Sequence, residues 1–205
     1  MPNDHLHRNQ LTITRAKSEQ PDGYTGKVIW FTCCSGSGKS TRGDALVVEL
    51  HACGLRTCLL DGDNMRRGLN RDLGFSEADR LENTRRIAEV ARLMMEAGLV
   101  VLKVFISPFA RVRELARALI GSDDFLEVYV GAPREVCEQR DVKGIYMLAC
   151  TAKIAHMTGI DSRTKPPRSP DCNADAANRA MSDIVQDLMK LSAPADPPLH
   201  AIEMR

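Results

Sequence analysis

The sequence is poor in the features that define several large classes of protein. Aromatic residues make up 4% of its 205 residues, and the net charge at pH 7 is only +1. No apolar run approaches the roughly 20 residues of a transmembrane helix, and the polar amino-terminal residues lack the apolar centre of a signal peptide. A nearly neutral chain has no polybasic signature, so neither nucleic acid nor an acidic membrane is expected as a partner. We therefore expect a soluble, cytoplasmic protein.

Cysteine is present, but not in a pattern typical of zinc sites or disulfide frameworks. The seven cysteines are odd in number and form no C-x-x-C pair, and the five histidines form no cluster. Cys33 and Cys34 are adjacent in the chain, and adjacent cysteines rarely have the geometry of a disulfide bond. We expect reduced thiols in an intracellular enzyme.

Apolar runs typical of strands alternate with segments of helical periodicity, which predicts an α/β fold with a central parallel sheet and helices on both faces. A chain of this length with 43% hydrophobic residues fits one core. Residues 1–26 are predicted to be a polar extension with little core, 27–192 the domain and 193–205 a flexible tail. The alternating segments are 27–33, 39–53, 56–60, 76–97, 99–106, 109–120, 125–130, 133–140 and 179–191.

Residues 35–41 read Ser-Gly-Ser-Gly-Lys-Ser-Thr between an expected strand and an expected helix. A phosphate-binding loop lies in this position, because its glycines turn backbone N–H groups toward an anion and the helix adds its positive end. The alternative is a glycine-rich turn without a ligand, but the order of strand, Lys-Ser-Thr and helix favours a nucleotide site. Lys39 adds a mobile charge, and the Ser40 hydroxyl can complete the shell of Mg²⁺. The predicted nucleotide contacts here are Ser35, Gly36, Ser37, Gly38, Lys39, Ser40 and Thr41.

One position of this loop departs from the pattern G-x-x-x-x-G-K-[ST]. Counting back from Gly38 places Cys33 where the first glycine belongs. A side chain there costs about 1 to 2 kcal/mol if the backbone is left-handed, and much less if it is extended. We expect phosphate binding to be weakened but not abolished.

Two carboxylates follow the second expected strand, in the sequence Asp61-Gly-Asp-Asn64. Ligands collect at the carboxyl ends of parallel strands, so this turn is expected beside the phosphate loop. One carboxylate can hold Mg²⁺ through water and the other can accept a proton from an attacking hydroxyl. The alternative is a surface turn that caps the next helix. We predict Asp63 as the base or the magnesium anchor.

Together with further motifs, these residues resemble the adenylylsulfate kinase family over about residues 27–171. The other motifs include Phe105-Ile-Ser-Pro-Phe109, Arg140-Asp-Val-Lys-Gly144 and Thr158-Gly-Ile-Asp-Ser162. The resemblance implies a three-layer P-loop kinase fold with a small lid at about 142–160, and a homodimer. It also implies transfer of the ATP γ-phosphoryl group, with Mg²⁺, to the 3′-hydroxyl of adenylyl sulfate in sulfate activation.

The resemblance also implies a substrate site with an aromatic surface and several cations. Phe75 would stack on adenine, Arg66 and Arg80 would grip the anionic group, and Asn83 would read polar edges. Taken singly, each residue is equally well a core residue or a solvated helix charge, and only their shared spacing favours the site. The other predicted substrate contacts are Asp61, Asp63, Ile106, Ser107, Lys143, Met157 and Thr158, and Arg140 is predicted on the nucleotide side.

The predicted catalytic set is Lys39, Asp63 and Ser107, whose hydroxyl we expect to position the substrate. For Arg140 and Lys143, which lie where the lid begins, the alternative is a salt bridge at a helix end. Direct in-line transfer of the phosphoryl group to the substrate hydroxyl does not require a phosphoserine intermediate at Ser107.

The expected lid departs from the family pattern. After Tyr146 the family usually continues Lys-Lys-Ala-Arg-Ala-Gly-Glu, whereas residues 147–153 read Met-Leu-Ala-Cys-Thr-Ala-Lys and lack those three cations. Met157 replaces an expected phenylalanine and is a poorer plate for a base. Three functions remain open: a working adenylylsulfate kinase, a degenerate homologue that binds nucleotide or adenylyl sulfate with little turnover, and a kinase of another small metabolite.

Overall fold

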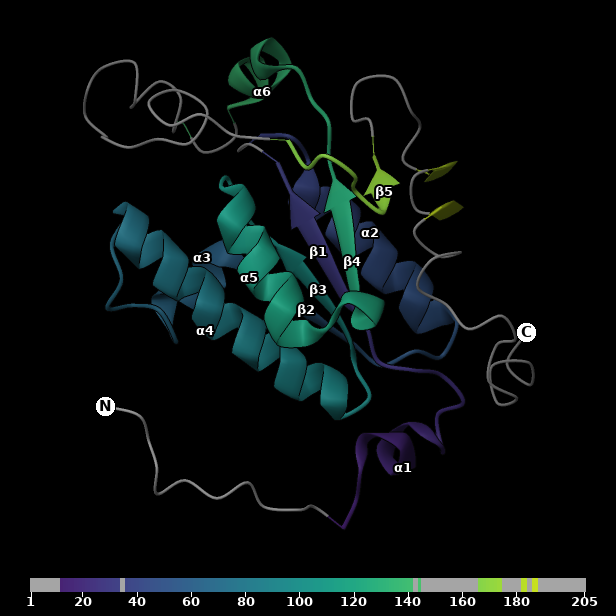
Figure 1. The fold of residues 1–205 in the computed structure, drawn as a ribbon. Coiled ribbons are helices and arrows are strands. Elements are labelled where there is room, and N and C mark those ends of the chain that lie inside the picture. The colour runs from purple at the N-terminus through teal and green to yellow at the C-terminus, as the bar shows by residue number, and fades with distance from the viewer. Residues whose placement is uncertain are drawn as a thin grey trace, which may run out of the picture.

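The computed structural model describes residues 12–33, 36–141, 144, 166–174, 182–183 and 186–187 (Figure 1). Its centre is a five-stranded parallel sheet in the order β2-β3-β1-β4-β5. This arrangement confirms the predicted parallel α/β fold. The strands are β1 (Val28–Thr32), β2 (Thr57–Asp61), β3 (Val100–Val104), β4 (Phe125–Tyr129) and β5 (Cys172–Asn173).

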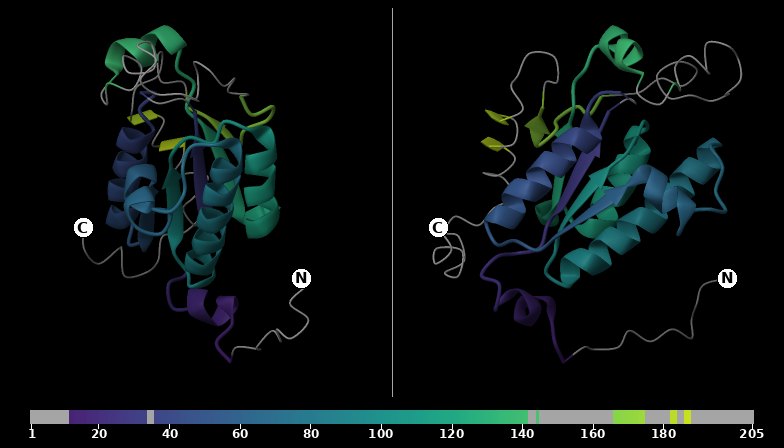
Figure 2. Two further views of the ribbon diagram at one scale, coloured as in Figure 1. Left: turned by 90° about the vertical axis from the view of Figure 1, so that its left-hand side faces the viewer. Right: turned by 180° about the vertical axis from the view of Figure 1, so that it is seen from behind.

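Helices cover both faces of the sheet, as Figure 2 shows with the sheet seen from its edge. Helix α2 packs on one face, and α4 and α5 pack side by side on the other. Helix α6 lies beyond the carboxyl ends of the strands, and α1 lies beyond their amino ends (Figure 1). The helices are α1 (Arg15–Glu19), α2 (Lys39–Ala52), α3 (Gly62–Arg67), α4 (Glu77–Glu96), α5 (Ala110–Ile120) and α6 (Arg134–Arg140), with a 3₁₀ turn at Ser122–Asp124.

Local sequence explains where α4 begins and ends. The Ser76 side chain caps its amino terminus by accepting a hydrogen bond from the Asp79 N–H at 3.1 Å. After the helix, Gly98 has φ of 87°, a left-handed conformation that glycine adopts without strain. The result is a 20-residue helix close to the predicted 76–97. The predicted final segment, 179–191, lies almost entirely outside the described residues.

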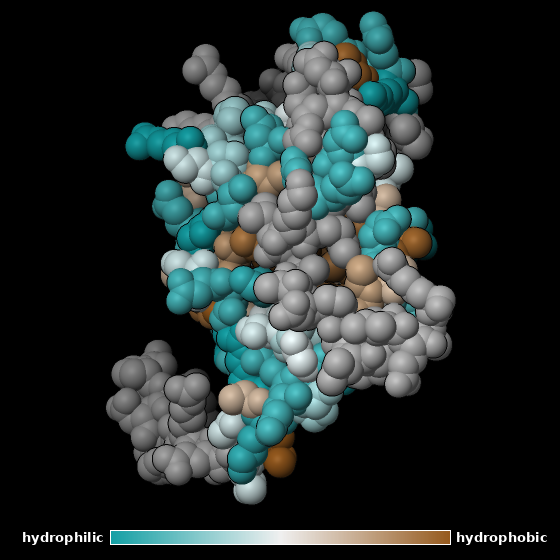
Figure 3. All heavy atoms as spheres, turned by 90° about the vertical axis from the view of Figure 1, so that its right-hand side faces the viewer, coloured by the Kyte–Doolittle hydropathy of each residue, from teal (hydrophilic) through white to brown (hydrophobic). Residues whose placement is uncertain are grey.

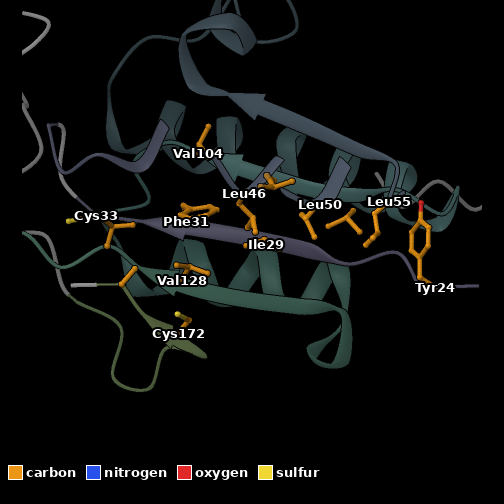
Figure 4. Close-up of a cluster of buried hydrophobic side chains, with 14 residues drawn as sticks. Tyr24, Ile29, Phe31, Cys33, Leu46, Leu50, Leu55, Val104, Val128 and Cys172 are labelled. Carbon is orange, nitrogen blue, oxygen red and sulfur yellow. The ribbon is translucent and has the colours of Figure 1, made fainter. Parts of the chain in front are cut away.

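A purely apolar cluster lies between the sheet and α2 (Figure 4). Leu46 and Leu50 of α2 pack on Ile29 and Phe31 of β1, and all four are fully buried. Burying each such side chain stabilises the fold by about 1.5 to 3 kcal/mol. This face therefore holds the phosphate-loop helix rigidly against the sheet.

The segment before β1 contributes more than the sequence suggested. Tyr24 is only 6% exposed and belongs to the α2-side cluster, and its hydroxyl accepts a hydrogen bond from the Arg56 N–H at 2.8 Å. Arg15 donates to both carboxylate oxygens of Asp124 and to the carbonyl of Gly26. The expectation of little core in residues 1–26 thus fails at Tyr24, because its aromatic ring packs under the sheet.

Within the described part of the chain, each helix is too short or too polar to span a bilayer. On the face drawn in Figure 3, hydrophilic side chains surround scattered hydrophobic ones.

Candidate active site

The predicted motifs meet around a cavity of about 640 Å³ at the carboxyl ends of the strands. Its walls come from the phosphate loop and α2, the turn after β2, the segment around the start of α4, and the end of β3. The lining residues are Gly36, Gly38, Lys39, Ser40, Thr41, Arg42, Asp61, Gly62, Asp63, Arg66, Phe75, Arg80, Asn83, Val104, Phe105, Ile106 and Arg140.

The phosphate loop depends on two glycines with left-handed backbone. Gly36 has φ of 72° and Gly38 has φ of 87°. A Cβ on Gly36 would lie 2.7 Å from the carbonyl oxygen of Cys137 in α6, so no larger residue fits. Cys33, the departure from the loop pattern, is 2% exposed and packs in the apolar cluster on the α2 side.

Two cations of α2 lie beside this loop. Lys39 is 6% exposed, and its ammonium donates to the Ser37 hydroxyl at 3.2 Å. Arg42 is 5% exposed and donates from Nη1 to the carbonyls of Ser37 and Gly38, both at 3.3 Å. A cation in the first turn of a helix is destabilised by the helix dipole. An anion bound there is stabilised by the dipole and by the cationic side chains. The pair therefore suits a polyphosphate.

The sequence did not point to Arg42, although a signal was present. It follows Lys39 by three residues, which is the spacing that places two side chains on the same face of a helix. Ser37, which was predicted as a nucleotide contact, is fully buried and is not among the lining residues. Only its backbone remains suited to phosphate binding.

The two aspartates after β2 have different local roles. Asp61 is the amino-terminal cap of α3, because its Oδ1 accepts hydrogen bonds from the N–H groups of Asp63 and Asn64 at 3.0 and 3.3 Å. This is the capping role that the sequence left open as an alternative. Asp63 lies in the first turn of α3, and both aspartates line the cavity. The cap thus fixes the turn that carries the predicted base.

Arg66, Phe75 and Arg80 form a stack at the other end of the cavity. The Cζ atoms of Arg66 and Arg80 lie 4.4 and 5.8 Å from the centroid of the Phe75 ring, which is 58% exposed. Arg66 donates to the carbonyls of Leu73 and Gly74 at 3.1 and 2.9 Å, and Arg80 donates to the carbonyl of Phe75 at 2.9 Å. Backbone acceptors therefore hold both guanidinium groups on the ring.

The electrostatics of this stack favour an anion. Burial lowers the pKa of Arg80, and the charge of Arg66 lowers it further. Burial also lowers the pKa of Arg66, against the opposing effects of Asp79 and Asp63. Both groups stay charged because an arginine titrates so far above neutral pH. Two like charges on one ring are relieved when an anion binds between them.

Asn83 lies behind this stack and is 7% exposed. Its side-chain oxygen accepts a hydrogen bond from the Asn70 amide at 3.0 Å. With its oxygen engaged, Asn83 presents its NH₂ as the group suited to an acceptor on a ligand. Asn70 belongs to the Gly68-Leu-Asn70 motif that resembles the family, but the sequence assigned it no role in the site.

Ser107 differs from the prediction, because it is fully buried and is not among the lining residues. Its hydroxyl contacts the indole N–H of Trp30 at 3.1 Å and the amine of Lys103. A substrate-positioning hydroxyl must face the substrate, and this one faces the protein interior. The neighbouring Ile106 does line the cavity, as does Arg140.

Several predicted residues lie outside the described part of the chain. They are Ser35, Lys143, Met157 and Thr158, together with the altered lid positions Met147, Leu148 and Cys150. The predicted magnesium pair, Ser40 and Asp63, does line the cavity. Within the described residues there is no cluster of three or more His, Cys, Asp or Glu side chains that could hold a metal. A hydroxyl and a carboxylate suit Mg²⁺, which keeps several waters and takes further oxygens from phosphates.

The comparison with protein families decides what this cavity belongs to. The family model described as adenylylsulphate kinase matches residues 25–175. The chain belongs to the adenylylsulfate kinase family. Adenylylsulfate kinases are ATP-dependent enzymes that phosphorylate an alcohol group, so the predicted family and enzyme class are confirmed.

Solved structures agree with this family. The adenylylsulfate kinase CysC from Mycobacterium tuberculosis, in complex with AMPPNP and APS, is 44% identical with a TM-score of 0.78, and the match covers 82% of this chain and 97% of that one. A hexameric adenylylsulfate kinase from Thiobacillus denitrificans is 27% identical with a TM-score of 0.63, covering 86% of this chain and 30% of that one. A gluconokinase from Sinorhizobium meliloti, 19% identical with a TM-score of 0.55 over 82% of this chain and 91% of that one, shares only the fold.

Proposed function

We infer that this chain is a working adenylylsulfate kinase, which transfers the γ-phosphoryl group of ATP to the 3′-hydroxyl of adenylyl sulfate. The observation that carries this inference is that the phosphate loop, the acidic turn and the arginine–phenylalanine stack open into one cavity. Phosphoryl transfer requires a donor and an acceptor within direct displacement distance. One shared cavity meets that requirement.

At the nucleotide end, we propose that the backbone N–H groups around Gly36 and Gly38 cradle the phosphates. Lys39, Arg42 and Arg140 neutralise their charge, and all three line the cavity. Ser40 and Asp63 are the residues that would hold Mg²⁺, and the ion would supply positive charge against the phosphates. The nucleotide end then leaves the γ-phosphoryl group facing the acidic turn.

At the acceptor end, we propose that the adenine of adenylyl sulfate stacks on the exposed face of Phe75. Arg66 and Arg80 bind the phosphosulfate, and the NH₂ of Asn83 donates to a polar edge of the substrate. This arrangement directs the ribose toward Asp63. Where Asp63 is the base instead of the magnesium anchor, its carboxylate accepts the proton of the 3′-hydroxyl as that oxygen bonds to the γ-phosphorus. The bond from the γ-phosphorus to the β,γ-bridging oxygen breaks, and ADP leaves.

A degenerate homologue was the main alternative, because the lid has lost three of the cations usual in the family. Arg42 supplies a buried cation at the phosphate loop, and it comes from α2 instead of from the expected lid. We propose that this guanidinium compensates in part for the altered lid. Both Asp63 and the phosphate loop line the cavity, as turnover requires.

A coupled assay for ADP release tests this function directly. Magnesium ATP should yield ADP only when adenylyl sulfate is added, and the second product should be 3′-phosphoadenylyl sulfate. No substrate-dependent ADP at millimolar adenylyl sulfate would refute the enzyme. ADP release with gluconate or another metabolite alcohol, but not with adenylyl sulfate, would favour the metabolite kinase instead.

We also propose that the enzyme acts in the cytoplasm, in sulfate assimilation, as a homodimer. Assembly varies within the family, since the relative from Thiobacillus denitrificans is hexameric. Light scattering coupled to size-exclusion chromatography gives the mass in solution. A mass near twice 22.7 kDa is expected, and a monomer or hexamer would contradict the dimer.

A further inference from the structure

A lysine lies inside the sheet, directly beneath the site. Lys103 of β3 is fully buried, with its amine 4.5 Å from the ring centroid of Trp30 and 3.9 Å from that of Phe105. It forms no ion pair with any residue in the described part of the chain. Taking an ammonium group out of water costs several kcal/mol unless a counter-charge or very good hydrogen bonds compensate. An apolar side chain of the same length would fill this space without that cost.

The hydrogen bonds around Lys103 indicate that its amine is neutral. Its partners are the carbonyls of Phe31 and Phe105 and the hydroxyl of Ser107, which also accepts from the indole N–H of Trp30. A neutral amine has two N–H groups for the two carbonyls and a lone pair for the Ser107 O–H. Every hydrogen then has an acceptor. An ammonium would use its third N–H on Ser107 and leave the Ser107 hydrogen without one.

Burial and most of the nearby charges also favour a neutral Lys103. Burial lowers its pKa well below the usual value, and the charges of Lys39 on α2 and Arg113 on α5 lower it further. Glu127 on β4 opposes them, but it is the smallest of these influences and lies 2.7 Å from the Arg113 guanidinium. The surroundings therefore favour the uncharged form that the hydrogen bonds require.

The contacts of Lys103 lead to both halves of the site. Phe31 lies two residues before Cys33, at the point where β1 enters the phosphate loop. Phe105 lines the cavity and packs so closely on the acidic turn that a Cβ on Gly62 would lie 2.6 Å from the Phe105 Cβ. Gly62 connects Asp61 to Asp63. One amine thus joins the strand that carries the phosphate loop to the residue that supports the proposed base.

We propose that Lys103, as a neutral amine, is a positioning residue for phosphoryl transfer, which fixes the acidic turn relative to the phosphate loop through Phe31 and Phe105. This inference rests on the proposed function. It assigns Ser107 a structural place in the same chain of hydrogen bonds, in which its hydroxyl accepts from Trp30 and donates to Lys103. A displacement of about 1 Å in a reacting group can reduce turnover about 100-fold, so such a residue acts on kcat rather than on nucleotide binding.

The test compares Lys103→Met with Lys27→Met. Methionine keeps the length and apolar stem of Lys103 but removes its hydrogen bonds, whereas Lys27 precedes β1 at the opposite, amino end of the sheet. Lys103→Met should melt close to the wild-type temperature, because the gain from removing a buried amine offsets the hydrogen bonds that its partners lose. Its kcat should nevertheless fall at least tenfold, with KM for ATP within about threefold of wild type. Lys27→Met should keep wild-type kinetics.

Two results would overturn the positioning role. One is wild-type kcat in Lys103→Met. The other is a loss of kcat accompanied by a lower melting temperature, since that pattern describes a residue needed only for folding. If only the inference about Lys103 fails, the wild-type protein still releases ADP when adenylyl sulfate is added. If the proposed function fails, the wild-type protein itself shows no adenylyl sulfate-dependent ADP release.

The protonation state has its own measurement, which does not require turnover. In protein labelled with ¹⁵N at lysine, the wild type at neutral pH should show one amine nitrogen signal apart from the ammonium signals, and Lys103→Met should lack it. Ser107→Ala removes the proton donated to Lys103 and should shift that signal. A spectrum of wild-type protein with ammonium signals only would refute the neutral amine.

Discussion

The nucleotide end of the cavity is built from backbone held against backbone, whereas the acceptor end is built from long side chains stacked in the open. At the nucleotide end, Gly36 lies so close to the carbonyl of Cys137 that even a methyl group has no room. At the end proposed to bind the acceptor, the Phe75 ring remains 58% exposed, and its arginine neighbours donate hydrogen bonds to loop carbonyls.

This difference matches what we propose that each end binds. Phosphates are bound by N–H groups whose positions are set by the fold, so a rigid loop loses little entropy on binding. A nucleotide base is bound by stacking, which tolerates small movements of the aromatic plate. Substitutions at the nucleotide end should therefore affect stability and binding together, whereas those at the acceptor end should affect binding alone.

The largest effect is expected where the two ends meet, at Asp63. Asp63→Asn keeps the shape of the side chain but removes its capacity to accept a proton. If Asp63 is the general base, kcat should fall about 10²- to 10⁴-fold while the protein melts as wild type. Asp44→Asn, at an exposed position on α2, is the control and should be indistinguishable from wild type in the ADP-release assay. Wild-type turnover of Asp63→Asn would remove this residue from catalysis.

The next largest effect is expected at the rigid end, for Gly36→Ala. The new methyl group meets the Cys137 carbonyl, and the left-handed backbone adds about 1 to 2 kcal/mol of strain. Calorimetry should show at least tenfold weaker ADP binding together with a lower melting temperature. Gly121→Ala is the matched control, because Gly121 also has a positive φ of 105° but no atom within 4 Å of the added methyl. It should lose stability while binding ADP normally, and equal loss of ADP binding in both variants would contradict the role of the clash.

At the open end, Phe75→Ala should raise KM for adenylyl sulfate about tenfold, since stacking of a base on an aromatic ring contributes about 1 to 3 kcal/mol. Its melting temperature should hardly change, because the ring is mostly exposed. Leu93→Ala, with the same 58% exposure on α4, controls for loss of surface area and should leave KM unchanged. Phe75→Tyr keeps the ring and should restore KM; a raised KM in Phe75→Tyr would argue against stacking.

The smallest effect is expected outside the cavity, at the ion pairs of Glu82. Hydrogen bonds from Arg85 and then Arg86 lower the pKa of Glu82 from 4.5 to about 2. Because the folded pKa is the lower one, this contribution is present above about pH 4.5 and is lost as the pH falls toward 2. Such exposed pairs contribute less than about 1 kcal/mol.

Urea unfolding at several pH values measures that contribution. Glu82→Gln should be slightly less stable than wild type at pH 7, and the difference should vanish at about pH 2. A difference that grows on acidification would contradict the assigned sign. The KM of Glu82→Gln for adenylyl sulfate should equal that of wild type at every pH at which both proteins are folded.

Much of the fold and of the cavity follows from local patterns in the sequence. The apolar runs around residues 27–33 and 99–106 predicted buried parallel strands because both faces of those strands are covered. The Gly-Lys-Ser motif and the acidic turn predicted one edge of the sheet because parallel strands end there together. By contrast, β5 has only two residues and α3 has six, and patterns that short carry no periodicity.

The missed residues depend on contacts between distant segments. Lys103 is a single charge within an apolar run, and only the packing of Trp30 and Phe105 around it shows that it is buried. Ser107 occupies a family motif, but the direction of its side chain is set by a strand seventy-seven residues earlier in the chain. Motifs locate a residue along an edge of the sheet, and tertiary packing decides which side it faces.

The contacts of Arg15 stabilise the fold at the end of the sheet that lies away from the cavity. By joining the turn before β4 to the carbonyl of Gly26 ahead of β1, this side chain links two segments at the amino ends of the strands, away from the cavity. Substitutions at Arg15 are therefore expected to change the melting temperature more than the turnover.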